Sequence, residues 1–115
     1  TAVGKAIMAF MHDPEDVSQL LDKTQLKAIT RNTLTSKNDI LRELEDTRKR
    51  GYAIDREELE YGLVCIAAPV INAVGVPVAA LSCSAPIQRM DEENISRISE
   101  EVTRYALKIS SKLPY

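Results

Sequence analysis

The sequence predicts an α+β domain in which a short antiparallel sheet is flanked by helices and followed by a long C-terminal helix. Three observations carry this prediction. Apolar residues recur at helical spacing over residues 1–50, then stand in short runs between turn residues over 52–84, and return to helical spacing over 91–111. Helices followed by an antiparallel sheet and a further helix are typical of the α+β class.

The first two helices are marked by residues that favour helix starts. Thr1 can cap a helix over TAVGKAIMAFM, and Asp13 can cap a second helix with Pro14 at its first position. We expect the inward stripes to be Val3, Ile7 and Phe10 in the first helix and Val17, Leu20 and Leu21 in the second.

A third helix has the clearest signals of the first half. Residues 24–30 before it read only as a short helical turn or loop. Ser36 is its expected cap and Gly51 its expected end, because glycine readily takes the left-handed conformation that terminates helices. The stripe that we expect to face inward comprises Ile40, Leu41 and Leu44.

Three strands are expected after Gly51, at residues 52–54, 64–71 and 76–84. An acidic loop at 55–63 separates the first two, and NAVG joins the second and third. Both later strands are apolar on both faces, so we expect both faces of the sheet to be covered.

Asp91 is the expected cap of the last helix, which measures about 30 Å at roughly 1.5 Å per residue. Its apolar positions alternate steps of three and four: Ile95, Ile98, Val102, Tyr105 and Ile109. The chain starts on what reads as an interior cap, and three short strands are few for this much helix. We therefore expect the natural domain to include further strands upstream.

The composition is that of an ordinary globular domain, with 44% hydrophobic and 28% charged residues among 115. A net charge of −2 with no basic block does not favour a nucleic-acid-binding surface, and the cluster at 48–50 suits a helix C-terminus. No apolar run reaches membrane-spanning length, so we expect no membrane contact. Cys65 and Cys83 lie in apolar strands, which indicates a reduced, cytoplasmic protein.

One long pattern resembles the signature region of IclR-type bacterial transcription regulators. Gly51 is followed by Asp55, then Glu58 three residues on and Cys65 seven further, and the pattern continues to Asn72. TAVGKAIMAF and LTSKNDILRELEDTRKRGY match preceding stretches of the same family, so the resemblance covers essentially the whole chain. Ile71 departs from it, since the family usually shows an aromatic residue or histidine there.

The resemblance implies that residues 1–115 form a partial GAF-like, effector-binding domain, without cofactor or metal, that senses a small organic acid or related metabolite. It also implies a homodimer or tetramer. DNA would be bound only by a winged helix-turn-helix domain that precedes this chain. The family positions that contact effector match Thr1, Ala2, Val3, Asp55, Leu63, Cys65, Ser82 and Ser84.

The residue types at these positions suit a carboxylic acid. A helix start offers unpaired N–H groups and partial positive charge, and the serine hydroxyls can donate to an anion. Leu63 would be an apolar wall. Asp55 fits beside an anion if it accepts hydrogen bonds from a ligand hydroxyl or from loop amides, or if burial protonates it. Glu57, Glu58 and Glu60 are expected to face solvent or to cap the loop and are left out of the site.

The same residues also allow other interpretations. Taken singly, the helix cap, the cysteine, the serines and the aspartate all have ordinary structural roles. An enzyme would have to use Cys65 with His12 and Asp55, yet His12 reads as exposed, so we expect no catalytic residues. Two cysteines and one histidine lack metal-ligand spacing. A structural dimerisation module that uses the last helix remains the alternative.

The pairing of the last two strands determines how the site is arranged. A four-residue loop would place Cys65 opposite Ser82 and Leu63 opposite Ser84. A three-residue loop with a glycine bulge would place Cys65 opposite Cys83. We expect the first register, because it gathers the cysteine and the two serines on one face toward the start of the first helix.

Overall fold

The computed structural model describes residues 1–23, 33 and 36–114, and over these residues the chain has an α+β fold. Its helices are α1 (Ala2–Ala9), α2 (Pro14–Lys23), α3 (Lys37–Arg50) and α4 (Glu92–Ser110). Its strands are β1 (Ala53–Arg56), β2 (Leu63–Ile71) and β3 (Pro77–Pro86), and a 3₁₀ turn, η1 (Ile87–Arg89), leads into α4. The predicted class and the long last helix are confirmed. The turn expected at residues 24–30 lies outside the described residues.

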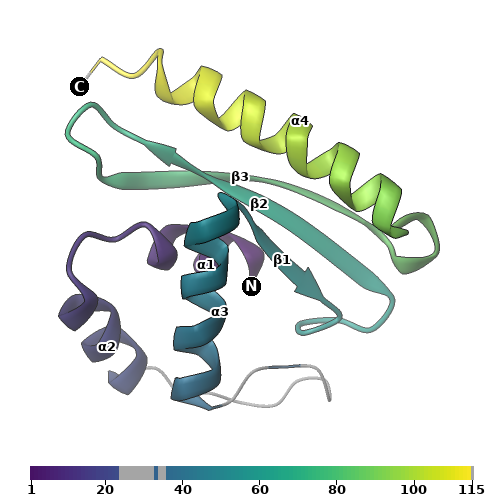
Figure 1. Cartoon of the computed structure of the whole chain (residues 1–115), viewed down its shortest axis with the longest axis horizontal. Coiled ribbons are helices and arrows are strands. Elements are labelled where there is room, and N and C mark those ends of the chain that lie inside the picture. Colours follow the sequence, from purple (N-terminus) through teal and green to yellow (C-terminus); the bar gives the residue numbers. More distant parts are fainter. Residues whose placement is uncertain (24–32, 34–35, 115) are drawn as a thin grey trace.

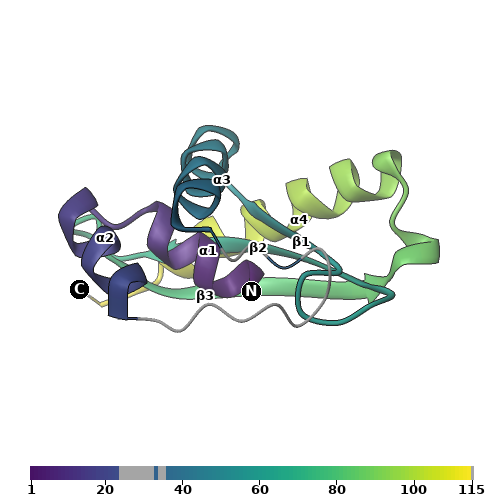
Figure 2. The ribbon, with the colours of Figure 1, turned by 90° about the horizontal axis from the view of Figure 1, so that it is seen from below.

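The strands form an antiparallel sheet in the order β1-β2-β3. Helix α4 lies along one face of this sheet, while α1, α2 and α3 lie on the other side (Figure 1). Seen from below, α1 and α3 lie side by side (Figure 2). Among the described residues, no helix combines the length and the apolar character that crossing a membrane requires.

Each predicted helix cap forms. A first-turn N–H donates to each capping side chain, at Thr1, Asp13, Ser36 and Asp91. Gly51 ends α3 with a φ of 91°, in the left-handed conformation that the sequence predicted. Because the caps depend on local backbone groups, residue type and spacing were sufficient to place them.

The inward faces of α1 and α4 differ from those predicted. Helix α1 turns its small residues to the sheet, burying Ala2, Lys5, Ala6 and Ala9, whereas Val3 is 37% exposed. In α4 the predicted Ile95 and Val102 are buried together with Ser99 and Ala106, while the predicted Tyr105 and Ile109 are exposed. In α2 only Leu20 of the expected stripe is exposed. Small side chains let α1 approach the strands closely, and in α4 Ser99 and Ala106 are buried beside the larger Ile95 and Val102, so the size of a side chain as well as its hydropathy determines the buried stripe.

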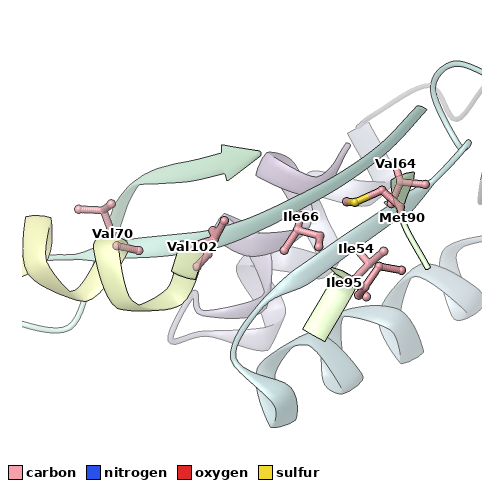
Figure 3. Packing of buried hydrophobic residues seen from close by; sticks show 9 residues of the cluster. Ile54, Val64, Ile66, Val70, Met90, Ile95 and Val102 are labelled. Atoms are coloured by element: carbon pink, nitrogen blue, oxygen red, sulfur yellow. The ribbon is translucent and has the colours of Figure 1, made fainter. Parts of the chain in front are cut away.

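The main core lies between α4 and the sheet (Figure 3). It contains Ile54, Val64, Ile66, Ala68, Val70, Met90, Ile95, Val102 and Ala106. A second cluster joins α1, α2 and α3 through Ala9, Val17, Leu21, Ile40 and Leu44. A third, made of Ala2, Ala6, Ala53 and Ala67, holds α1 against the opposite face of the sheet.

The strands run further than the sequence indicated. β1 continues to Arg56, so Asp55 lies within a strand and not in the acidic loop, which is reduced to residues 57–62. β2 is buried on both faces over most of its length, as expected. β3 is half-buried to exposed, so the expectation of full cover was wrong for that strand.

The predicted register of the β2–β3 hairpin was also wrong. The turn uses three residues, Ala73 to Gly75, with Gly75 at φ 85° and Asn72 N–H donating to Val76 O over 2.9 Å. A bulge then leaves Val78 without an opposite residue, since Ile71 pairs with Pro77 and Val70 with Ala79.

Two features favour the bulge, and the second comes from a helix distant in the sequence. Pro77 has no N–H to donate to the ladder, and the N–H of Ile71 donates instead to Ser110 Oγ on α4 over 3.0 Å. The turn and the bulge each move the register by one residue relative to the predicted four-residue loop. Two such shifts restore the original faces, so Cys65 lies opposite Ser84 and still shares a face with Ser82.

Candidate ligand-binding site

A row of three polar side chains crosses the sheet on the face that carries α1. Asp55 of β1 pairs with Cys65 of β2, and Cys65 pairs with Ser84 of β3. The Cys65 thiol and the Ser84 hydroxyl share a hydrogen bond of 2.9 Å. Residues far apart in the sequence are thus brought together by strand pairing alone.

Two further predicted residues lie on the same face. Ser82 is opposite Ala67, whose side chain packs under α1, and Leu63 is two residues before Cys65. Ser82 and Ser84 are exposed, and Leu63 is half-buried. The two hydroxyls therefore stand on an accessible surface next to a leucine side chain.

The start of α1 lies over this face. Ala2 is buried against Ala53 and Ala67, and Cys65 packs at the edge of the same cluster. The first hydrogen bond within α1 runs from Lys5 N to Thr1 O, so the N–H groups of Ala2 and Val3 precede it. Together with the helix dipole they give this end of α1 a partial positive charge.

Asp55 is the buried member of the row, with only 3% of its surface exposed. Its Oδ1 accepts a hydrogen bond from Glu58 N over 2.8 Å, which holds the first turn of the 57–62 loop. This contact is one that the sequence reasoning anticipated, a carboxylate satisfied by a loop amide.

Sequence reasoning missed Lys5, a lysine that is 6% exposed. Its ammonium contacts Glu58 Oε2 at 2.7 Å, Ile54 O at 2.8 Å and Glu43 Oε1 at 3.5 Å. Glu58 was expected to face solvent or to cap the loop; its side chain is 15% exposed and paired with this lysine, and it also accepts a hydrogen bond from Arg56 N. The sequence did carry a signal for this residue, because Lys5 stands among alanines at helical spacing. A lysine on such a buried face requires acidic partners.

Two surface hollows lie away from the predicted residues. One of about 670 Å³ lies between the end of α3 and α4 and is lined by Arg50, Tyr52, Ser99, Glu100, Thr103, Arg104, Leu107 and Lys108. A hydrogen bond from Arg104 to Glu101 raises the pKa of Arg104, which stays charged. The other, of about 460 Å³, lies among α1, α2 and α3. Neither hollow includes a predicted site residue.

The thiol of Cys65 and the imidazole of His12, which an enzyme would have to use together, are well separated. His12 donates to Gly75 O at the β2–β3 turn over 2.6 Å, whereas Cys65 lies six residues before the end of β2. At about 3.3 Å per residue, that places them roughly 20 Å apart along the strand. Within the described residues, no cluster of three or more metal-ligating side chains occurs.

Comparison with known proteins identifies relatives along the full chain. A family model for the C-terminal part of the bacterial transcriptional regulator IclR matches residues 1–111. The HTH-type transcriptional regulator KdgR of Escherichia coli K12 is 39% identical over 115 residues, which cover all of this chain and 43% of KdgR. The chain thus spans less than half the length of this relative. Because the matched proteins are named as transcription regulators, the prediction that the chain is not an enzyme is confirmed.

Solved structures agree with this comparison. The C-terminal domain of E. coli KdgR superposes with a TM-score of 0.94 at 39% identity, covering all of this chain and 70% of that one. A double mutant of the PobR inducer-binding domain from Acinetobacter, in complex with 3-hydroxybenzoic acid, superposes with a TM-score of 0.86 at 30% identity. It covers 96% of this chain and 63% of the PobR chain.

Proposed function

The chain belongs to the family of IclR C-terminal domains, and on that premise we propose that it binds a small organic acid and thereby controls DNA binding by the full-length regulator. The observation that carries the proposal is the polar row on the α1 face of the sheet. Ser82 and Ser84 expose hydroxyls there, beside the start of a helix.

The chemistry of this surface suits a carboxylate. The N–H groups of Ala2 and Val3 and the serine hydroxyls are donors, and Thr1 adds a hydroxyl at the helix start. Leu63 and Cys65 offer apolar contact to the body of the acid. Asp55 accepts hydrogen bonds and would select an acid that also carries a hydroxyl group.

The PobR complex supports an acid of this kind. Its ligand, 3-hydroxybenzoic acid, combines a carboxylate with a hydroxyl on an apolar ring. Donors at the helix start and on β3 would take the carboxylate of such a molecule, and the Asp55 side would take its hydroxyl. The structural likeness of the two domains makes this acid the first to test.

The proposal extends to the whole protein. DNA would be bound through a winged helix-turn-helix domain outside residues 1–115, and further strands would complete the sheet. Relatives that regulate transcription act on DNA, which in a bacterium lies in the cytoplasm, so we place the protein there. We also propose a homodimer or tetramer, and sedimentation of the full-length protein at micromolar concentration would test it.

A thermal-shift screen tests the ligand. The full-length protein would be mixed with 3-hydroxybenzoate, other aromatic acids, 2-oxo acids, hydroxy acids and sugar acids. A ligand at 100 times its dissociation constant stabilises the folded protein by about 2.7 kcal/mol, which is readily measured. A positive acid should also change affinity for operator DNA. Stabilisation by none of these acid classes would contradict the proposal.

A structural dimerisation module is the second candidate. Helix α4 exposes Tyr105, Leu107 and Ile109, with Leu107 65% exposed, and such a surface could bind another subunit. Under this alternative, the oligomer forms without any ligand and no acid alters DNA affinity. The same DNA-binding measurement therefore separates the two candidates.

A further inference from the structure

Lys5 is a charged residue in a buried position on α1. It lies among alanines on the face that α1 turns to the sheet and is 6% exposed. Burial of an ammonium group is unfavourable unless each of its donors has a partner. Its partners come from three different parts of the fold: Ile54 O in β1, Glu58 in the 57–62 loop, and Glu43 in α3.

Glu58 in turn organises the 57–62 loop. Its Oε2 accepts from Arg56 N over 3.3 Å as well as from Lys5, and its own N–H donates to Asp55 Oδ1. The hydroxyl of Thr33 donates to its carbonyl oxygen. Glu57, the preceding residue, has a φ of 59°, which a non-glycine residue adopts only when its surroundings hold it there. Contacts of Glu58 thus hold the first part of the loop, while its end is held by Gly62 N donating to Glu57 Oε1 over 2.9 Å and by Glu57 N donating to Leu63 O over 3.0 Å.

The contacts of Lys5 join the two sides of the candidate site. Lys5 belongs to α1, whose start carries Thr1 to Val3, and Glu58 is hydrogen-bonded to Asp55. An ammonium group has three N–H donors, and Lys5 has three acceptors within contact distance. No donor is left for a ligand, so any effect of Lys5 on binding must be indirect.

We propose that Lys5 is a positioning residue whose ion pair with Glu58 fixes the 57–62 loop, and with it Asp55, relative to the start of α1. The effect on acid binding rests on the proposed function. The effect on the loop does not, because it follows from the contacts of the protein itself.

Hydrogen exchange in the full-length protein tests the loop. Lys5→Met removes the charge and keeps the length of the side chain, and Glu58→Gln removes the partner charge while Lys5 keeps Ile54 O and Glu43. Amides of residues 56–63 should exchange about tenfold faster or more in either variant. Amides of β2 and α4 should be unchanged. The double variant should exchange no faster than the faster single variant, because both substitutions remove the same pair.

Lys49→Met is the matched control, since Lys49 forms a comparable pair with Glu45 at 3.5 Å but both side chains are about 70% exposed. It should leave loop exchange unchanged. Unchanged loop exchange in a folded Glu58→Gln variant would overturn the proposal. Equal acceleration in the loop and in α4 would do the same, because it would indicate a general loss of stability. If Lys5→Met does not fold, Glu58→Gln alone decides.

Calorimetry with 3-hydroxybenzoate, or with the acid that gives the largest thermal shift, tests the consequence for binding. Affinity should fall about tenfold or more in the Glu58→Gln variant and stay unchanged in Lys49→Met. Unchanged affinity despite a loosened loop would overturn the positioning role. If the unmodified protein binds no acid, the proposed function fails, and loop exchange still decides whether Lys5 fixes the loop.

Discussion

The sulfur of Cys65 lies 2.9 Å from the hydroxyl oxygen of Ser84, the residue directly opposite it on β3. This contact exists because a three-residue turn and a bulge each shift the hairpin by one residue. If only one of them were present, Cys65 would lie opposite Cys83, and the two serines would belong to the α4 face. The pairing of Cys65 with Ser84 therefore depends on both irregularities together.

A cysteine at position 84 should form a disulfide with Cys65. The short distance between Sγ and Oγ shows that the two side chains already meet, so Ser84→Cys in a Cys83→Ala background should cross-link under mild oxidation. Intact-mass measurement before and after reduction would detect the bond. Ser82→Cys is the control, because its opposite residue is Ala67. Preferential cross-linking of the control would show that the hairpin has the register with Cys65 opposite Ser82.

Enlarging Ala6 should destabilise the domain. Ala6 is fully buried between α1 and the sheet, in contact with a cluster made only of alanines. Ala6→Leu forces extra volume into a close helix–sheet contact and should lower the free energy of unfolding by about 1–3 kcal/mol. Urea denaturation measures the change. Ala73→Leu, at the exposed hairpin turn, should have little effect, and equal losses from both variants would contradict the close packing of α1.

Two glycines with positive φ should respond differently to alanine. At Gly51 an added Cβ meets nothing within 4 Å, so Gly51→Ala should cost only the backbone strain, about 1 kcal/mol. At Gly75 the same Cβ would lie 3.0 Å from His12 Nε2 and would disturb the hydrogen bond from His12 to Gly75 O. Gly75→Ala should therefore cost more.

The larger destabilisation expected for Gly75→Ala depends on His12, so removing the histidine should abolish it. In a His12→Ala background, both glycine substitutions should lower the melting temperature by similar amounts. A persistent difference between them would mean that the turn at Ala73 to Gly75 carries strain unrelated to the histidine.

The features that the sequence predicted correctly are those governed by neighbouring residues. The caps at Thr1 and Asp91 and the stop at Gly51 require only local backbone groups. The grouping of Cys65, Ser82 and Ser84 on one face followed from strand periodicity and survived the wrong register.

The features that were missed depend on partners distant in the sequence. The N–H of Ile71 is taken by Ser110 on α4, and no local pattern foretells that contact or the bulge beside it. Lys5 is buried only because Glu43 and Glu58 fold around it. The inward face of α4 follows from close approach to the sheet, so the apolar residue Tyr105 was misplaced at a position that stays exposed.

Ser82 offers the most direct test of acid binding. Its hydroxyl is exposed and forms no hydrogen bond with the described residues, so its removal should leave the free energy of unfolding within about 0.5 kcal/mol. If it donates to a carboxylate, Ser82→Ala should weaken binding of the acid found in the screen by about 1–3 kcal/mol, the usual cost of losing a hydrogen bond to a charged group. Calorimetry measures the loss. Ser96→Ala on α4, across the sheet, should bind the acid normally. Equal affinities of Ser82→Ala and the unmodified protein would exclude Ser82 from the site. The groups that donate to the carboxylate would then be those at the start of α1.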